Sequence, residues 1–312
     1  MAKKMAIASW WGTTKPGRYN LHNSSHSQVL QEKYGYEISC IKKKMLPYEV
    51  YYNSFKDADI VVINNGFRSN IINAGRAARD LDKNIIYTEA GVMPQFPYVS
   101  LDDKGLFCTH SLCSDLSWIN DQHIEDYKNY IKQSKYHTYM KYNDVKNNII
   151  LCCLQVSNDA QLTYCTSLNN IYLIDKCFNL YPGKNIVIRF HPKMSQEDSL
   201  YTLDYVKKTY SGRQYKLIHS SAAKKIPFLS QAASASIIFG LNSTVLIESL
   251  IIGKKVVALA DCPIKNQLLD TDLAGDEYEN RKLKLLAGYF CSQYKRGDIT
   301  GAEKALERFK FL

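Results

Sequence analysis

The sequence of 312 residues predicts an α/β protein with two Rossmann-like domains, and three observations support this fold class. The length exceeds what one hydrophobic core usually organises, so we expect two domains, residues 1–143 and 144–312. Apolar strands alternate with helix-length segments in both halves, and the short connections between them are typical of parallel sheets. Unusual polar residues follow several of the strands, where open α/β sheets bind their ligands.

In the first half, apolar runs predict strands and amphipathic spacing predicts helices. The strands are expected at residues 5–11, 36–41, 58–66 and 84–91, and the helices at 24–33 and 70–81. The polar, Tyr- and Lys-rich span 122–142 is expected to be helical and to connect the two domains.

The second half repeats the alternation. Strands are expected at 147–155, 185–192, 215–219, 235–240 and 254–260, with a helix within 161–180 and another at 243–253 closed by a glycine. Residues 302–312 read as an amphipathic helix, for which three roles stay open: a return to the first domain, a membrane contact, or the stump of a truncation.

Composition describes an ordinary globular protein, with 46% hydrophobic and 22% charged residues. No stretch reaches the ~20 apolar residues that a membrane helix needs, and the apolar N-terminal run is too short for a signal peptide, so we expect a cytoplasmic protein. The nine cysteines lack metal-ligand spacing, and the adjacent Cys152 and Cys153 are interpreted as core residues. The net charge of +10 favours anionic partners, but no nucleic-acid module accompanies it.

One candidate site begins where a strand runs into Gly240 and Asn242, Ser243 and Thr244 open a helix. Backbone N–H groups and small hydroxyls at a helix N-terminus suit a phosphate group. Glu248 follows one turn later, at a spacing that reaches ribose hydroxyls. The alternative is an ordinary helix cap by Asn242 or Ser243.

Three further segments place polar residues after strands. In the segment 189–193, Pro192 keeps His191 out of helical geometry, so its imidazole is available to a phosphate, with Arg189 and Lys193 as nearby cations.

Gln155 and Asp159 follow the strand at 147–155, where Asp159 is also a plausible helix cap. Glu89 ends a strand of the first domain. A carboxylate from each domain, facing across a cleft, suits a two-step glycosyl transfer.

These segments, in this order, resemble the retaining beta-Kdo glycosyltransferases of bacterial capsule and O-antigen synthesis. The resemblance rests on Asn-Asn-Gly-Phe-Arg-Ser at 64–69, Thr-Glu-Ala-Gly at 88–91 and the Pro-to-Gly stretch 97–105. It continues through Gln-Val-x-x-Asp, Arg-x-His-Pro and Asn-Ser-Thr-x-x-x-Glu, and spans roughly residues 64–260. Two departures are the missing Trp at 64–66 and Ala90 in place of an acidic residue.

The resemblance implies a GT-B fold with an active-site cleft between the domains, the first binding the acceptor and the second the nucleotide sugar. It implies transfer of Kdo, an acidic eight-carbon sugar, from CMP-Kdo with retention of configuration and without a metal or other cofactor. By analogy Asp159 is the nucleophile, Glu89 the base, and His191 stabilises the leaving phosphate. The nucleotide sugar is held by the remaining candidates: Gln155, Arg189, Pro192, Lys193, Asn242, Ser243, Thr244 and Glu248.

The expected partners are a CMP-sugar donor and a glycan or glycolipid acceptor, with peripheral contact at the inner membrane and no nucleic acid. Three other functions remain open. The first is another cytidine-nucleotide transferase on the same scaffold, either an inverting sialyltransferase or a polyol-phosphate transferase. The second is a non-catalytic glycan- or nucleotide-binding domain. The third is a nucleic-acid-binding protein, for which a steep salt dependence of affinity would speak.

Overall fold

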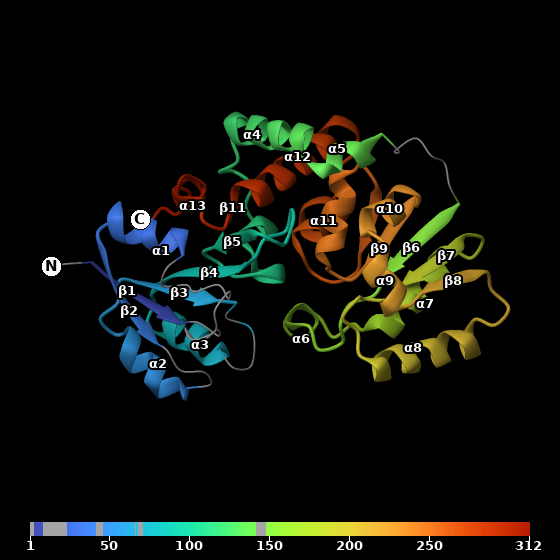
Figure 1. Ribbon diagram of the computed structural model, residues 1–312, viewed down its shortest axis with the longest axis horizontal. Helices are drawn as coiled ribbons and strands as arrows, with labels where there is room; N and C mark the ends of the chain where they lie inside the picture. The colour runs from blue at the N-terminus through green and yellow to red at the C-terminus, as the bar shows by residue number, and fades with distance from the viewer. Residues whose placement is uncertain (1–2, 9–23, 42–45, 66, 68–70, 142–147) are drawn as a thin grey trace. The chain divides into compact units, whose positions relative to one another are not determined.

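The computed structural model describes residues 3–8, 24–41, 46–65, 67, 71–141 and 148–312 (Figure 1). The chain divides into two compact units. The first unit contains residues 1–120 and 287–312, and the second contains residues 121–286. Each unit is built around its own sheet.

The sheet of the first unit has the strand order β11-β5-β4-β3-β1-β2. Strands β1, β2, β3 and β4 are parallel, whereas β5 and β11 are antiparallel additions at one edge. The strands are β1 (Lys3–Ala8), β2 (Tyr36–Ile41), β3 (Ile60–Asn64), β4 (Asn84–Ala90), β5 (Tyr98–Asp102) and β11 (Gln293–Lys295). The helices are α1 (Ser25–Glu32), α2 (Tyr48–Phe55), α3 (Ile72–Asp80) and α13 (Ile299–Leu306), with 3₁₀ turns at Phe107–Thr109 and Ser111–Cys113.

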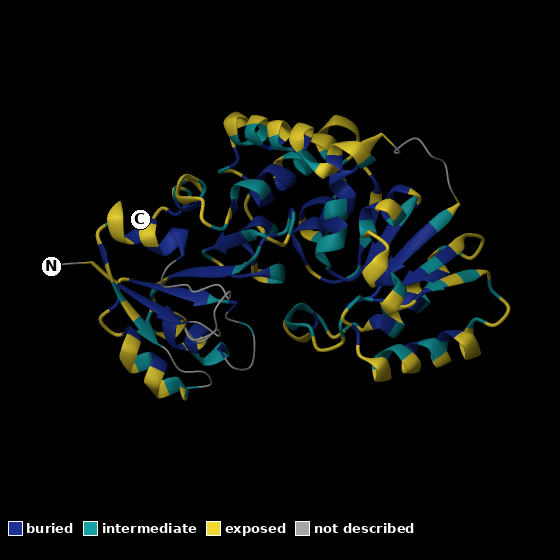
Figure 2. Ribbon diagram, in the orientation of Figure 1, coloured by how far each residue is buried: buried dark blue, intermediate teal, exposed yellow. Residues whose placement is uncertain are grey.

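Local sequence explains the central part of this sheet. In β3 four consecutive apolar residues are buried, as expected for an inner strand of a parallel sheet covered on both faces. Helix α3 buries a face of small residues, Ala74, Ala77 and Ala78, which lets its backbone approach the sheet closely. In Figure 2 the strands of this sheet are mostly dark blue, which marks buried residues, and the outer helices carry the yellow of exposed residues.

The sheet of the second unit has five strands, all parallel, in the order β10-β9-β6-β7-β8. The strands are β6 (Ile149–Cys153), β7 (Asn185–Arg189), β8 (Tyr215–Ile218), β9 (Ile237–Gly240) and β10 (Lys255–Ala258). The helices are α4 (Asp121–Gln133), α5 (Lys135–Met140), α6 (Ala160–Cys165), α7 (Asn170–Leu180), α8 (Gln196–Thr209), α9 (Ser220–Lys225), α10 (Phe228–Ala233) and α11 (Thr244–Ile251), with a π-helix at Lys265–Leu269. Helix α12 (Gly275–Cys291) begins in the second unit and ends in the first, which resumes at Ala287.

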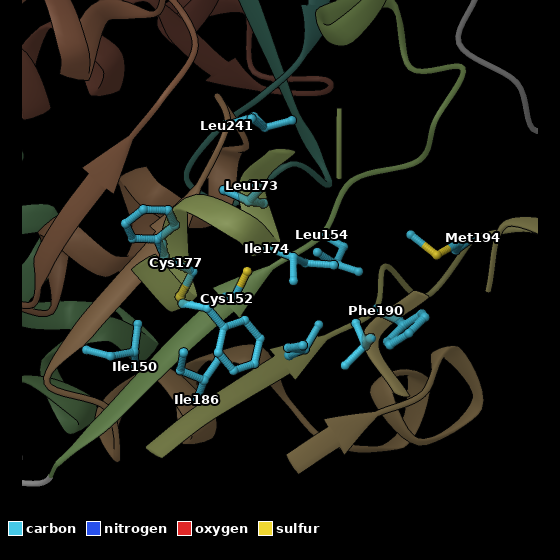
Figure 3. Close-up of a cluster of buried hydrophobic side chains, with 14 of the residues drawn as sticks. Ile150, Cys152, Leu154, Leu173, Ile174, Cys177, Ile186, Phe190, Met194 and Leu241 are labelled. Carbon is cyan, nitrogen blue, oxygen red and sulfur yellow. The ribbon is translucent and has the colours of Figure 1, made fainter. Parts of the chain in front are cut away.

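The core of the second unit joins β6 and β7 to α7 and to the residues that follow the strands (Figure 3). Cys152 and Cys153 are both buried, and burial raises the pKa of the Cys153 thiol to about 12. Their interpretation as core residues is therefore confirmed.

The strands predicted within the described residues are all present, and their ends differ from the predicted ones by at most three residues. The loop expected after the first strand, the end of that strand, and part of the 64–69 motif lie outside the described residues. Strands β5 and β11 and helices α2, α8, α9, α10 and α12 are elements that sequence patterns did not indicate.

The domain boundary differs from the predicted one between residues 143 and 144. Helices α4 and α5, predicted to connect the domains, belong to the second unit, where α5 packs against α10 and α11. The chain then returns to the first unit. Strand β11 pairs with β5, and α13 packs against α1 with Leu306 and Phe309 in the core. Of the three roles left open for the C-terminal segment, the return to the first domain is confirmed.

Candidate functional site

The site in the second unit lies at the point where the strand order reverses. The chain moves from β6 to β7 and β8 on one side, then crosses to β9 and β10 on the other. In such sheets the ligand crevice lies beyond the carboxyl ends of the two strands that flank the reversal. Those strands are β6 and β9, which are followed by Gln155 and Asn242. The topology therefore brings together two segments that lie 87 residues apart.

Gln155 and Asn242 bind each other. The Gln155 Nε2 group donates to Asn242 Oδ1 at 3.1 Å, and the Asn242 backbone N–H donates to Gln155 Oε1 at 3.1 Å. Asn242 Nδ2 also donates to the carbonyl of Gln161 at 3.3 Å. The two residues are only 4% and 7% exposed. Because an unpaired buried amide costs about 1–3 kcal/mol, this pairing stabilises the junction and positions the neighbouring residues.

Ser243 occupies the N-cap position of α11 without capping it. Its backbone is extended, but its hydroxyl accepts no hydrogen bond from the helix. Within the part of the chain that the structure describes, the hydroxyl has no other partner. The first turn of α11, which begins at Thr244, also contains no acidic residue. A helix start of this kind carries partial positive charge and suits an anion. The alternative of an ordinary cap by Asn242 or Ser243 does not describe this turn.

Glu248 is held from α5, on the segment expected to be a linker. Tyr136 donates from its hydroxyl to Glu248 Oε1 at 2.9 Å, and Lys135 Nζ lies 3.8 Å from the same oxygen. Burial raises the pKa of Glu248, while Lys135 and Tyr136 oppose the rise. Both partners use Oε1, and the second oxygen has no hydrogen-bond partner among the described residues. Tyr136 and Lys135 were not identified from sequence, where they stood in a polar, Tyr-rich stretch.

His191 follows β7 with a defined orientation. Its Nδ1 accepts the Lys193 backbone N–H at 3.0 Å, so the ring proton is assigned to Nε2. Burial lowers the pKa of His191, Asp159 opposes that change, and Lys193 and Arg189 reinforce it. A neutral imidazole with an Nε2–H group is therefore the form present at pH 7, and it acts as a hydrogen-bond donor.

Arg189 has a different role from the predicted one. Its guanidinium is 7% exposed and binds Gln231 Oε1 together with the carbonyls of Ala223 (3.0 Å) and Ile226 (3.2 Å). These contacts fasten β7 to α9 and α10, so Arg189 is a structural cation rather than one that offsets the charge of a ligand. Lys193 is exposed, and Pro192 forms the turn between it and His191.

Asp159 is the N-cap of α6. Its Oδ1 accepts the Gln161 backbone N–H at 2.9 Å, as the capping alternative predicted. Its Oδ2 has no hydrogen-bond partner among the described residues. Gln161 also accepts from Asn242, so one residue links the Asp159 turn to the start of α11. The Gln161 side-chain oxygen is buried without a partner in the described part of the chain.

Glu89 lies in the first unit near the end of β4, whereas the other ten candidates lie in the second unit. Asn65 donates from its side chain to one oxygen of Glu89, and the Ala90 backbone N–H donates to the other at 2.9 Å. Asn65 adopts a left-handed φ of 68°, a conformation that asparagine tolerates better than most residues. Asn65 belongs to the Asn-Asn-Gly segment that stands in place of the expected Trp-containing turn. The sequence did not indicate its contact with Glu89.

The glycine of the Glu-x-Gly motif is required by packing. A Cβ on Gly91 would lie 2.5 Å from the Tyr98 Cβ and 3.0 Å from Gln293 Oε1. The Gly91 backbone N–H donates to the Tyr98 carbonyl at 2.9 Å, which closes the β4–β5 hairpin directly beyond Glu89. The motif therefore combines a polar side chain with a close backbone approach.

The stretch 97–105 contains a structural carboxylate, Asp102. Asp102 is fully buried and accepts hydrogen bonds from the Lys104, Gly105 and Ser111 backbones, with Arg308 at 3.2 Å. Burial alone would raise the pKa of Asp102, but the neighbouring His110, Arg308 and Ser111 bring it below its ordinary value. This network holds the end of β5 in place, and Arg308 connects it to the C-terminal segment.

Among the described residues, no group of three or more His, Cys, Asp or Glu side chains is arranged to hold a metal ion. No helix within the described ranges is long and apolar enough to cross a lipid bilayer.

Two solved structures resemble this chain over almost its whole length. One, from Thermosulfurimonas dismutans, is described as KpsC, beta Kdo 2,7 transferase; it is 15% identical, with 98% of each chain covered and a TM-score of 0.63. The other, from the same organism, is described as KpsC, beta Kdo 2,4 transferase; it is 16% identical, with 96% of each chain covered and a TM-score of 0.62. The predicted fold class, two Rossmann-like domains of the GT-B kind, is confirmed.

No curated protein matches the sequence. A family model described as "Capsule polysaccharide biosynthesis protein" matches residues 105–263, which is half of the chain and includes all the candidate residues except Glu89. The chain belongs to the capsule polysaccharide biosynthesis protein family.

Proposed function

We propose that this protein is a glycosyltransferase of capsule polysaccharide synthesis that transfers Kdo from CMP-Kdo to a glycan or glycolipid, with retention and without a metal. The observation that carries the proposal is the grouping of three features beyond β6, β7 and β9. These are the uncapped start of α11 at Ser243, the Nε2–H donor of His191, and the open oxygen of Asp159. Membership of the family and the likeness to structures described as Kdo transferases support the choice of sugar.

The donor fits the charges of this site. The start of α11 and the Ser243 hydroxyl bind the CMP phosphate, and the second oxygen of Glu248 accepts from the ribose. His191 donates from Nε2 to the phosphate oxygen that leaves. Gln155 and Asn242 act through these residues, because their amides hold the two strand ends in register.

Transfer proceeds in two displacements. Asp159 Oδ2 attacks the anomeric carbon, and the bond from that carbon to the CMP phosphate breaks, with the electron pair leaving on CMP. The acceptor hydroxyl then attacks the same carbon from the opposite face and gives its proton to Glu89. The glycosyl ester bond breaks, and the Asp159 carboxylate is restored. Two inversions give net retention.

The nucleotide proposal predicts that CMP raises the melting temperature more than UMP or GMP at equal concentration. Ligand that binds only the folded chain stabilises it by RT ln(1 + [L]/Kd), about 2.7 kcal/mol at 100 times Kd. Replacing Ser243 with alanine should remove about one hydrogen bond to a charged group and weaken CMP binding roughly tenfold. Thermal shift and calorimetry measure both effects. Ser195, the N-cap of α8, is the matched control because its hydroxyl caps a helix that the proposal leaves without a ligand. Equal stabilisation by UMP would remove the CMP-sugar assignment.

His191 is predicted to contribute to turnover and not to folding. An alanine at this position removes the Nε2–H donor to the leaving phosphate, which should lower kcat by about 10² to 10³-fold. Unfolding in urea should change little, because the ring is half-buried and its one hydrogen bond in the described structure is to the Lys193 backbone. His219, which follows the next strand and whose ring is tilted by 32° against that of Phe190, is the control position. A His191→Ala enzyme with normal kcat would make His191 a structural residue.

A further inference from the structure

Helix α11 contains a single ionisable residue, Glu248, although most of the helix is buried and apolar. The other polar residue beyond its first turn, Ser249, is satisfied within the helix, because its hydroxyl donates to the Val245 carbonyl at 2.6 Å. Only 18% of the Glu248 side chain is exposed. Burial of a carboxylate is costly unless its oxygens are paired. Packing alone therefore does not account for a glutamate at this position.

The carboxylate of Glu248 is held through one of its two oxygens. The fully buried Tyr136 donates from its hydroxyl to Oε1 at 2.9 Å, and Lys135 Nζ lies 3.8 Å from the same oxygen. Both residues come from α5, which packs against α11 (Figure 1). Oε2 has no hydrogen-bond partner among the described residues, and it is not one of the fully buried polar atoms that lack a partner. The contacts with α5 thus leave Oε2 accessible.

Glu248 belongs to the accessible strip of α11. Ser243, Thr244 and Val245 are half-buried at the start of the helix, and Glu248 is the one residue beyond them in α11 that is not buried. Thr244 and Glu248 are one turn apart and share a face, and long helical side chains lean toward the N-terminus. From Ser243 to Glu248 the helix rises about 7.5 Å. A nucleotide with its phosphate at the start of α11 would therefore bring its ribose to Glu248.

We propose that Tyr136 is the positioning residue of a ribose subsite and gives the protein a preference for ribonucleotides over nucleotides without ribose hydroxyls. Tyr136 does not touch the ligand. It occupies Oε1 and so presents Oε2, whose lone pairs accept from the 2′- and 3′-hydroxyl groups. The presence of a nucleotide at α11 rests on the proposed function, whereas the role of Tyr136 is a separate claim about selectivity.

The charges around Glu248 suit this role. Burial raises the pKa of Glu248, whereas Lys135 and Tyr136 lower it and so favour the ionised form, which is the stronger acceptor for hydroxyl groups. The Lys135 side chain is 57% exposed, and ion pairs with exposed partners contribute little. The buried hydroxyl of Tyr136 is therefore the contact that fixes the orientation of the carboxylate.

The test is isothermal titration calorimetry of the full chain with CMP and with 2′,3′-dideoxycytidine monophosphate, which lacks both ribose hydroxyls. The unmodified chain is expected to bind CMP roughly tenfold to a hundredfold more tightly, as hydrogen bonds to a charged group predict. Glu248→Ala should abolish this preference. Tyr136→Phe keeps the buried ring and removes only the hydroxyl. It should lower the preference roughly tenfold, through weaker binding of CMP alone.

Tyr205→Phe is the matched control. Tyr205 on α8 donates to Asp175 Oδ1 on α7 at 2.8 Å, so this variant also loses a tyrosine–carboxylate hydrogen bond between two helices of the second unit. The proposed mechanism uses neither residue, and the affinities for both nucleotides should stay unchanged. Unchanged binding of the dideoxy nucleotide by Tyr136→Phe would show that its fold and phosphate site are intact.

An unchanged preference in Tyr136→Phe, or an equal loss of affinity for both nucleotides, would overturn the proposal and leave Tyr136 as a contact that only joins α5 to α11. Equal binding of the two nucleotides by the unmodified chain would remove the ribose subsite and leave the phosphate site at α11 standing. The proposed function fails in a different way. In that case neither nucleotide binds the unmodified chain, and the subsite is lost with it.

Discussion

Replacement of Asp159 by asparagine is expected to abolish sugar transfer while CMP still binds. The change removes the carboxylate oxygen that attacks the anomeric carbon, and loss of a nucleophile lowers kcat by roughly 10⁴-fold or more. Folding should be nearly unaffected, because asparagine caps helices as well as aspartate does and can still accept the Gln161 N–H. A coupled assay of CMP release and a thermal shift with CMP measure the two properties on the same preparation.

Asp298 provides the matched control for this experiment. It is also an N-cap aspartate, of α13 in the first unit, and accepts the Gly301 N–H at 2.9 Å. Asp298→Asn therefore makes the same chemical change in the same structural role, at a residue that the proposed mechanism does not use, and should leave turnover normal. An Asp159→Asn enzyme with near-normal turnover, or a product of inverted configuration, would contradict the double displacement. The fold assignment would stand in either case.

Replacement of Glu89 by glutamine is expected to stop the reaction after the first displacement. The amide retains the shape of the side chain and can still accept from Asn65, but it cannot take the proton of the acceptor hydroxyl. General-base removal costs about 10² to 10⁴-fold in rate. Intact-protein mass spectrometry after mixing with CMP-Kdo should show one added Kdo residue, and peptide mapping should locate it on Asp159.

The control for this variant is Glu37→Gln on β2, an exposed glutamate of the same sheet. It should turn over normally and accumulate no adduct. An adduct in the Glu89→Gln enzyme that maps to a residue other than Asp159 would reassign the nucleophile. A Glu89→Gln enzyme that completes transfer at the normal rate would show that another group takes the proton.

The sequence alone determined the alternation of strands and helices and the polar residues that follow the strands. These features are local. A run such as Ile60 to Ile63 is apolar because both faces of a parallel sheet are covered, and Pro192 restricts His191 whatever its surroundings. The same reasoning predicted the residues at the two strand ends of the second unit, Gln155 and Asn242, which the sheet order then brought together.

Only the tertiary structure decided what each of those polar side chains contacts. The chemical types of Arg189 and Asn242 suit a ligand, yet their partners are distant protein groups: Gln231 for the first, Gln155 for the second. Likewise, no pattern indicated that Tyr136 holds Glu248, since the two lie 112 residues apart.

The return of the C-terminal segment to the first unit is also visible only in the tertiary structure. Strand β11 has three residues, too few for a recognisable period, and it forms because the edge of β5 offers unpaired backbone groups. That pairing moved residues 287–312 into the first unit and supplied Gln293 and Arg296 to the β4–β5 loop. Backbone pairing between distant segments depends on complementary edges and not on side-chain identity, and for that reason it left little trace in the sequence.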